Sequence, residues 1–588
     1  MDIFNVLSLL GGLAMFLYGM NVMGDGLAKT AGGKLEKILE KLTSTPIKGV
    51  LLGAAVTGVI QSSSATTVMV VGLVNSGIMK LRQAVGIIMG ANIGTTVTSW
   101  ILSLTGIQSD NIFINMLKPS SFSPILAVIG IIFLMFTKSE KKHDIGGILL
   151  GFTVLMFGME MMSGAVAPLK DVPEFTNILT MFSNPFLGML VGMLITAIIQ
   201  SSSASVGILQ ALCATGAVSF GTAIPIIMGQ NIGTCVTALI SCIGTKKNAK
   251  RAAFVHLYFN IIGTVVFMVV FYTVNSFVHF QFLNDSANAA GIAVVHSVFN
   301  VAATLLLLPF SGGLEKLATL TVRDKDEVEK NTPAELEMLK RLDARFLEKP
   351  AFAVGHCIEV VKYMAQLSKN SVDMALSLVD NYDEAVRDKV EDLEGIIDTY
   401  EDEVGSYMVK LSSKELSHED SQKVSIGLHV IGDLERMSDH AITIADICRK
   451  MNEAGASFSE KAKSELGVYK DAVQNIVSMT VEAYDKEDLQ EASHVEPLEE
   501  AINELNSAVK KQHIKRLQKC TIELGISLEN LINNYERVAD HCSNVAVAML
   551  QLKSDNFDTH EYLDNMKKDS NIDFQSMYTY YREMYKLK

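Results

Sequence analysis

The chain has 588 residues, enough for several domains of ordinary size. It carries 64 acidic and 50 basic residues, a formal net charge of −14 that is unevenly distributed. Residues 1–310 contain 16 Lys or Arg and 11 Asp or Glu (net +5), whereas the remaining 278 contain 34 and 53 (net −19). The sparsely charged first part is typical of a membrane domain and the acidic second part of a soluble one. This division excludes a secreted disulfide scaffold, a single soluble enzyme and a nucleic-acid binder with a basic surface. The seven cysteines show no CxxC spacing and are expected to be reduced thiols.

An apolar run from Ile3 to Met23 opens the membrane half, and eight further hydrophobic segments follow it. Most are long enough to cross a bilayer as helices. Two of them are interrupted in the middle by a run of hydroxyl side chains. We therefore expect an all-α protein that begins with a polytopic membrane domain. The eight segments lie at 49–79, 84–105, 123–137, 145–167, 186–218, 222–244, 252–278 and 290–310.

The two interruptions are copies of one another. Gln61-Ser62-Ser63-Ser64-Ala65 recurs 139 residues later as Gln200-Ser201-Ser202-Ser203-Ala204, and the Gly-x-Asn-Ile-Gly-Thr motif at 90–95 recurs at the same offset at 229–234. An ungapped alignment of 45–98 on the second copy has 24 identities in 54 positions. The membrane domain, 1–312, is therefore expected to contain repeat 1 (about 1–138), repeat 2 (about 143–278) and an extra helix at 290–310.

Basic residues indicate how the repeats lie in the membrane. They cluster at 29–48, 80–82, 138–142 and 246–251, whereas the loops of repeat 2 that correspond to the first two clusters hold only Lys170. If basic loops are cytoplasmic, the two repeats have opposite orientations. Inverted repeats with broken helices are typical of secondary transporters. The sequence shows no nucleophile–base constellation, so we do not expect an enzyme.

Segment 49–79 has basic residues at both ends, which predicts that it enters the membrane, turns and leaves on the same side. The arm from Gly49 to Ile60 has 12 residues, about 18 Å of helix and roughly half a bilayer. The alternative is one long helix with a serine-rich interface, because small residues favour helix packing.

A glutamine and three serines at a helix break offer hydroxyls, a carboxamide and free backbone N–H groups. Half-helix N-termini bind anions, and hydroxyl and carbonyl oxygens suit a small hard cation such as Na⁺. The apolar cores contain no Lys or Arg, so an anionic substrate would need a cotransported cation. The residues alone thus predict a small anion or an amino acid, moved with Na⁺.

Two further polar pairs lie in the membrane half. The next helix of each copy carries an Asn and a Thr after glycine, Asn92 and Thr95 in the first copy and Asn231 and Thr234 in the second. They are interpreted either as site residues beside the serines or as polar packing. A His-x-x-Phe-Asn pattern occurs at 256–260 and at 296–300. It is interpreted as hydrogen-bonded scaffold or as a proton relay.

The duplicated QSSSA motifs, their Asn-Ile-Gly-Thr partners and the Phe-Leu-Tyr-Gly-Met sequence at 16–20 resemble the type II sodium–phosphate cotransporter family over about 1–310. The resemblance implies Na⁺-coupled movement of inorganic phosphate, with both hairpins forming the site. Val206 stands where the first copy has Thr67, so hydroxyl ligation there is not symmetric. The candidate substrate and sodium ligands are Gln61, Ser62, Ser63, Ser64, Thr66, Asn92, Thr95, Gln200, Ser201, Ser202, Ser203, Asn231 and Thr234.

The second half begins with a charged linker, expected over 313–349, followed by a helical domain over 350–555 and a C-terminal tail over 556–588. The domain has few prolines and an apolar spacing typical of helices. Leu-Glu-x-x-x-Asp at 393–398 resembles Leu-Glu-x-x-x-Asn at 498–503, and Glu-Arg-x-x-Asp-His at 435–440 recurs at 536–541. The offsets of 105 and 101 predict two three-helix units of about 100 residues each.

Acidic residues four apart share one face of a helix. On an exposed face they are solvated charge, but facing pairs on two helices can close a carboxylate cage for a divalent or iron cation. The recurrent pattern resembles the PhoU family of helical phosphate-signalling domains over about 350–550. Asn503 breaks the pattern in the second copy. The carboxylates that the resemblance assigns to metal are Glu394, Asp398, Glu435, Asp439, Glu499, Glu536 and Asp540.

The expected function is Na⁺-coupled transport of inorganic phosphate by a multi-pass plasma-membrane protein with a cytoplasmic PhoU-like regulatory domain. The alternatives are a phosphate exporter and a non-transporting phosphate sensor. The expected partners are phosphate, Na⁺ and the lipid bilayer, and no nucleic acid. The sequence leaves open whether the chain also forms a homodimer or binds a cytoplasmic regulatory partner.

Overall fold

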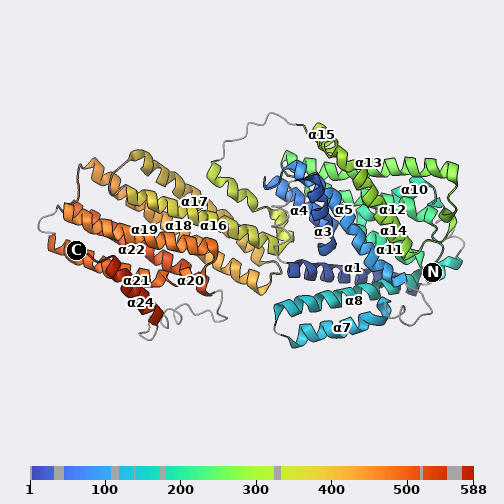
Figure 1. The fold of residues 1–588 in the computed structure, drawn as a ribbon, viewed down its shortest axis with the longest axis horizontal. Coiled ribbons are helices and arrows are strands. Elements are labelled where there is room, and N and C mark those ends of the chain that lie inside the picture. Colours follow the sequence, from blue (N-terminus) through green and yellow to red (C-terminus); the bar gives the residue numbers. More distant parts are fainter. Residues whose placement is uncertain are drawn as a thin grey trace. The chain divides into compact units, whose positions relative to one another are not determined.

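The computed structural model divides the chain into two compact units, Met1–Val328 and Glu329–Lys588, here called the membrane unit and the soluble unit (Figure 1). The residues that the structure describes are helical apart from turns and one isolated bridge, which confirms the all-α fold class. Of the basic residues noted above, Lys34, Lys37, Lys41 and Lys138 lie outside the described residues. The described ranges are 3–31, 45–106, 118–137, 139–172, 181–323, 333–516, 521–551 and 572–587.

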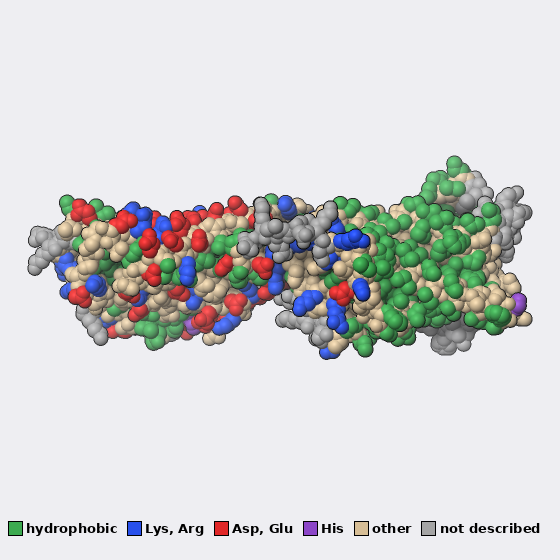
Figure 2. All heavy atoms as spheres, turned by 90° about the horizontal axis from the view of Figure 1, so that it is seen from above, with side chains coloured by type: hydrophobic (Ala, Val, Ile, Leu, Met, Phe, Trp, Pro, Cys, Tyr) green, Lys and Arg blue, Asp and Glu red, His purple; other side chains and the backbone are tan. Residues whose placement is uncertain are grey.

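The membrane unit contains six described helices that are long and apolar enough to cross a membrane. The shorter helix α7 and four half-helices complete the pattern of segments expected from the sequence. Figure 2 shows hydrophobic side chains over much of the visible surface of this unit, as a lipid-facing surface requires. The helices are α1 (Ile3–Ala31), α3 (Pro46–Ile60), α4 (Ser63–Asn75), α5 (Leu81–Ser103), α7 (Pro119–Phe136), α8 (Glu140–Val166), α10 (Pro185–Ile199), α11 (Ser202–Cys213), α12 (Phe220–Ser241), α13 (Lys247–Val278), α14 (Ala289–Leu307) and α15 (Ser311–Thr321).

The first helices of the two repeats, α1 and α8, pack against each other in antiparallel orientation. A Cβ atom added to Gly12 would lie 2.9 Å from the carbonyl oxygen of Gly158, and one added to Gly19 would lie 2.6 Å from that of Gly151. Gly12 and Gly19 correspond to Gly151 and Gly158 at the offset of 139, so exchanging the repeats exchanges the two contacts. This is the contact pattern of a two-fold axis perpendicular to the helices. It confirms that the repeats are inverted.

The half-helix α3 runs parallel to α5, although α4 separates them along the chain. A Cβ on Gly49 would lie 3.2 Å from the Cα of Gly86, and one on Gly94 would lie 2.6 Å from the Cβ of Thr57. Residue numbers therefore rise together along the two helices, and both helices begin at the same end of the unit. The chain between them must enter and return, as the re-entrant hairpin predicts. Glycine contacts arrange α10 and α12 in the same way in repeat 2.

The soluble unit consists of two groups of three long helices, as the repeat spacing predicts. In the first group α16 packs on both α17 and α18, and in the second α22 packs on both α19 and α21. Helices α18 and α22 join the two groups. Figure 2 shows charged side chains of both signs on the surface of this unit. The helices are α16 (Pro350–Ser377), α17 (Glu384–Ser412), α18 (His418–Glu453), α19 (Glu460–Lys486), the short α20 (Leu489–Ala492), α21 (Val495–Arg516) and α22 (Ile522–Gln551).

The segments expected to be linker and tail contain more structure than predicted. In the linker, α15 packs on α5 and α13 of the membrane unit, while two 3₁₀ helices (Ala334–Arg341 and Ala344–Glu348) pack on α16 and α17. The hydroxyl of Tyr407 donates to the carbonyl oxygen of Asp343 over 3.1 Å, and Phe346 is buried. In the tail, α24 (Ile572–Met584) packs on α21. Buried aromatic residues at positions 574, 581 and 585 lie on one face of this segment and stabilise its docking.

Candidate functional site

Both hairpins are broken at the glutamine of the QSSS motif, with the same backbone geometry. Gln61 has φ 59° and Gln200 has φ 58°, in the left-handed region that favours glycine. The N–H of each glutamine donates to the carbonyl oxygen of the threonine four residues earlier, Thr57 or Thr196, over 2.8 and 2.7 Å. Each half-helix therefore ends at a strained residue that is not glycine. Strain of this kind is typical of functional sites.

The serine after each glutamine caps the second half-helix. The side-chain oxygens of Ser62 and Ser201 each accept a hydrogen bond of 3.2 Å from the backbone N–H of the alanine three residues later. Both serines have extended backbone conformations, as N-cap residues do. A capping hydroxyl is used as an acceptor, so its own proton can still be donated to a ligand oxygen.

The two breaks come together in the membrane unit. The hydroxyl of Ser64 lies 3.5 Å from the backbone carbonyl oxygen of Gln200. Helix α4 also contacts α12 of the other repeat, and α11 contacts α5. The structure thus brings the N-terminal ends of α4 and α11 into one region. Because a helix N-terminus is electropositive and presents free N–H groups, this region can attract an anion.

The two glutamine side chains differ. The carboxamide of Gln61 is buried, accepts a hydrogen bond of 2.9 Å from the hydroxyl of Thr98 and donates to the carbonyl oxygen of Gly58. The side chain of Gln200 is exposed and has no hydrogen-bond partner in the described part of the chain. Its expected partner by the repeat offset, the hydroxyl of Thr237, also has no hydrogen-bond partner among the described residues. Only Gln200 can therefore present its carboxamide to a ligand without first breaking a bond.

The remaining hydroxyls of the motif lie mostly inside the protein. Ser63, Ser202 and Ser203 are buried, and Ser64 is half-buried. Thr66 is buried, and its hydroxyl donates to the carbonyl oxygen of Ser62 over 3.1 Å. The structure brings these candidates together around the two breaks, but their role as ligands stays a prediction.

The Asn-Ile-Gly-Thr residues make their hydrogen bonds away from the serines. The amide of Asn92 donates to the side-chain oxygen of Asn260 on α13 over 2.9 Å, whereas that of Asn231 donates to a carbonyl of its own helix. The hydroxyls of Thr95 and Thr234 also donate to carbonyls one turn earlier in their helices. These bonds agree with polar packing, and a role in binding ligand stays a prediction for all four.

The two intramembrane histidines also differ. A ring nitrogen of His296 lies 2.7 Å from the hydroxyl of Ser99. Neither ring nitrogen of His256 has a partner within the described ranges, although the residue is buried. The repeat counterpart of Ser99 is Ala238, which has no hydroxyl to offer. The scaffold interpretation thus fits His296 better than His256.

The four expected metal carboxylates of the first copy lie on α17 (Glu394, Asp398) and α18 (Glu435, Asp439) of the soluble unit. Burial raises the pKa of Glu394, and the neighbouring charges of Asp439 and Asp398 raise it further. Burial also raises the pKa of Glu435, with Asp439 adding to the effect. These four side chains therefore share one electronegative region, as the two-helix pattern predicts.

The corresponding carboxylates of the second copy are largely paired with their neighbours. Glu499 is buried and accepts a 2.5 Å hydrogen bond from the amide of Asn503. Glu536 lies 3.4 Å from Lys510, and Asp540 lies 3.3 Å from Arg537. Burial nevertheless raises the pKa of Asp540. Among the described residues, no three His, Cys, Asp or Glu side chains are arranged to hold a metal ion, so metal binding stays a prediction in both copies.

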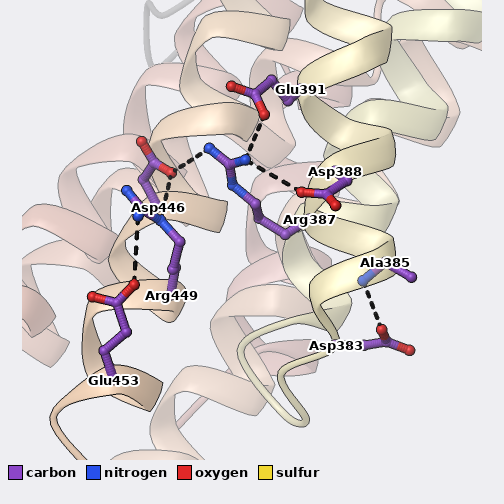
Figure 3. A network of polar contacts seen from close by, with 8 residues as sticks. All are labelled: Asp383, Ala385, Arg387, Asp388, Glu391, Asp446, Arg449 and Glu453. Atoms are coloured by element: carbon purple, nitrogen blue, oxygen red, sulfur yellow. Dashed lines mark hydrogen bonds and ion pairs between the residues drawn. The ribbon is translucent and has the colours of Figure 1, made fainter.

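A polar network links α17 to α18 near the carboxylates of the first copy (Figure 3). Arg387 donates to Asp446 over 3.1 Å and to Glu391 over 2.5 Å. Arg449 pairs with Asp446 and with Glu453, both at 3.4 Å. The two arginines partly neutralise the acidic ends of these helices and hold them together.

Sequence reasoning missed a reciprocal contact between the two helical groups. A ring nitrogen of His440 lies 2.7 Å from the side-chain oxygen of Asn534, and one of His541 lies 2.8 Å from the carboxylate of Asp433. His440 corresponds to His541, and Asp433 to Asn534, at the offset of 101 noted for this motif. Each three-helix group thus binds the histidine of the other group through a hydrogen bond. The offset of 101, which relates the two histidines and their partners, was the sequence signal that could have predicted this contact.

Known protein families match both halves of the chain. The model of the Na⁺/Pi-cotransporter family matches residues 15–164 and 171–292, and the PhoU domain model matches 361–448 and 468–549. The chain is 30% identical to the uncharacterized protein YqeW of Bacillus subtilis over 314 residues, 53% of this chain and 97% of that protein.

Two further relatives carry functional names. The chain is 23% identical to the "Putative inorganic phosphate export protein YjbB" of Salmonella typhimurium over 569 residues, 95% of this chain and 99% of that protein. It is 38% identical to the "Sodium-dependent phosphate transport protein 2A" of Rattus norvegicus over 99 residues, 16% of this chain and 15% of that protein. The membrane unit with its two QSSS hairpins and the helical soluble unit therefore identify the chain as a membrane protein of the Na⁺/Pi-cotransporter family that carries a PhoU domain.

Proposed function

We propose that the protein moves inorganic phosphate across the plasma membrane together with Na⁺, and that its two QSSS breaks form the binding site. The observation that carries this proposal is the meeting of the breaks, where the Ser64 hydroxyl reaches the carbonyl oxygen of Gln200. Hydroxyl protons, backbone N–H groups and a free carboxamide at one place match the oxygens of a phosphate ion.

Electrostatics support the requirement for Na⁺. Helices α4 and α11, which begin at the two breaks, contain no charged residue. The partial positive charge of two helix N-termini, about half an elementary charge each, does not balance a phosphate ion. A cation bound in the same region supplies the missing charge, and two ligands that attract each other raise each other's affinity.

The direction of net transport is a separate part of the proposal. Coupling to inward Na⁺ flow would give uptake, which is the first candidate; the name of the sodium-dependent relative supports the coupling and states no direction. Export is the second candidate, because the relatives that match over nearly the whole chain carry the name of phosphate export proteins.

Labelled phosphate in proteoliposomes tests this function. Wild-type protein should accumulate phosphate when Na⁺ is high outside and not when choline replaces it, and vesicles preloaded with phosphate and Na⁺ should test export. Equal rates in Na⁺ and choline would contradict Na⁺ coupling. Phosphate binding without movement in either direction would favour the sensor.

We further propose that the soluble unit is cytoplasmic and regulates transport. The basic loops before α5 and α13 lie close together, because the backbone N–H of Lys246 donates to the side-chain oxygen of Asn75 over 2.9 Å. Basic loops are typically cytoplasmic, which supports this orientation. Cysteines introduced at Lys80 and Lys247 should react with the same side-specific reagent. Reaction from opposite sides would contradict this topology.

Metal binding belongs to the same proposal for the soluble unit. The shared electronegative region around Glu394, Asp398, Glu435 and Asp439 can attract a divalent or iron cation. Addition of Mn²⁺ to metal-free protein should raise the unfolding temperature of the wild type and not that of Asp439→Asn. An equal rise in both proteins would place the metal elsewhere.

A further inference from the structure

The two repeats differ in how they satisfy the buried hydroxyls behind the glutamine breaks. In repeat 1 the hydroxyl of Thr57 donates to that of Thr66 over 3.0 Å, and Thr66 donates in turn to the carbonyl oxygen of Ser62. The corresponding residues of repeat 2, at the offset of 139, are Thr196 and Ser205. Neither hydroxyl has a partner among the residues described, although Thr196 is 0% and Ser205 is 1% exposed.

The backbone does not explain this difference. The two breaks have the same left-handed glutamine, with φ values of 59° and 58°, and the same serine cap. Unpaired buried hydroxyls are unfavourable, above all at membrane depth, where lipid offers no replacement hydrogen bond. Two such groups flanking one helix break therefore point to a ligand that supplies the missing contacts.

The surroundings of the Thr196 hydroxyl favour a cation over an anion. Thr196 lies in the last turn of α10, where free carbonyl oxygens make the helix end electronegative. Helices α10, α11 and α12 contain no charged residue that could bind an anion. Neutral oxygen atoms without basic neighbours are the ligands that small hard cations take. The side chain of Thr196 also packs directly on Gly233 of α12, which holds it in place.

We propose that the hydroxyl oxygens of Thr196 and Ser205 bind a Na⁺ ion behind the second break, and that repeat 1 has no equivalent ion. In repeat 1 the Thr57–Thr66 hydrogen bond already satisfies the corresponding oxygens. This inference rests on the proposed Na⁺-coupled function and adds a location to it. An ion at this place lies beside the N-terminus of α11, so its charge would strengthen phosphate binding there.

The test measures Na⁺ binding without requiring transport. Thermal unfolding of the full-length protein in detergent, free of phosphate, is followed while NaCl replaces choline chloride at constant ionic strength. Bound Na⁺ raises the unfolding temperature of the wild type. Thr196→Val and Ser205→Ala should each raise the Na⁺ concentration for the half-maximal effect about tenfold or more. Thr196→Ser keeps a hydroxyl and should retain the wild-type response.

Thr57→Val in repeat 1 is the matched control. It removes the same hydroxyl from the corresponding position, while Thr66 keeps its bond to the Ser62 carbonyl. Its Na⁺ response should equal that of the wild type.

Two results overturn the site. One is a wild type that Na⁺ does not stabilise beyond choline. The other is an unchanged Na⁺ response in folded Thr196→Val and Ser205→Ala, which would mean that the hydroxyls hold only water. A Na⁺ response that is lost in both variants, together with no phosphate movement in proteoliposomes, would support the site and reject the proposed transport function.

Discussion

The hydroxyl of Ser64 lies 3.5 Å from the backbone carbonyl oxygen of Gln200, which joins the first hairpin to the break of the second. These residues are 136 positions apart in the chain. The contact means that a ligand at one break is close to groups of the other repeat. A change at either QSSS motif should therefore affect one shared site.

The capping serines allow structure and binding to be separated. Ser62→Ala and Ser201→Ala should each lose an N-cap, at a cost of about 1 kcal/mol in stability. They should also lose a hydroxyl donor to phosphate, which lowers affinity by about 5- to 150-fold. Ser62→Asn and Ser201→Asn keep a capping oxygen and should remain as stable as the wild type.

Phosphate uptake in proteoliposomes and unfolding temperature in detergent check these variants together. The asparagine variants should transport poorly while they unfold at the wild-type temperature. Normal uptake by both asparagine variants would show that these hydroxyls only cap helices.

Replacing each left-handed glutamine by glycine should change the unfolding temperature to a different degree in the two repeats. Gln200→Gly relieves the backbone strain, worth about 1 kcal/mol, and breaks no side-chain hydrogen bond to the described residues. It should raise the unfolding temperature and lower phosphate affinity. Gln61→Gly also loses the bonds to Thr98 and Gly58, so it should gain less stability or none. Equal changes in the unfolding temperatures of the two variants would contradict the asymmetry.

Close helix approach makes the glycines of the second motif indispensable. A Cβ on Gly229 would lie 1.9 Å from the carbonyl oxygen of Met189, so α10 and α12 would have to separate. Gly229→Ala should destabilise the membrane unit by about 1–3 kcal/mol or more. In α8 nothing lies within 4 Å of a Cβ on Gly147, and Gly147→Ala should be neutral or stabilising by up to about 1 kcal/mol. Unfolding temperature and the yield of monodisperse protein distinguish the two, and a matching loss in Gly147→Ala would count against the packing explanation.

The raised pKa of Glu394 predicts a pH-dependent effect on stability. Its ionised form is disfavoured by burial and by neighbouring carboxylates. Its contribution to stability is therefore present below the ordinary glutamate pKa and is lost as the pH rises through the raised value. In metal-free protein, Glu394→Gln should raise the unfolding temperature of the soluble unit at pH 7 and have little effect at pH 4.

Asp388→Asn is the matched control on the same helix, because Asp388 pairs with Arg387 over 3.4 Å. It should not stabilise the soluble unit at pH 7. Stabilisation by both substitutions would mean that general negative charge, rather than the region around Glu394, sets the effect.

Much of the membrane architecture was predictable because it depends on patterns that one chain displays by itself. The offset of 139 revealed the duplication, and basic flanks at both ends of 49–79 predicted the hairpin. Apolar length predicted the spanning helices, because about 20 apolar residues in a helix cross the hydrocarbon core and a helix satisfies its own backbone hydrogen bonds there. The linker and tail were less predictable, because α24 is short and depends on docking to α21 through buried aromatic side chains.

The sequence by itself determined that two inverted copies of one hairpin exist, because inversion follows from repeat length, charge and hydropathy. It did not determine which hydroxyl pairs with which. Thr57 and Thr196 are identical residues at equivalent positions, yet one donates to a neighbour and the other has no partner in the described structure. Gln61 and Gln200 differ in the same way. Only the tertiary structure decided these pairings, because a hydrogen bond depends on rotamers and on helix packing within a few tenths of an ångström, which no residue pattern specifies.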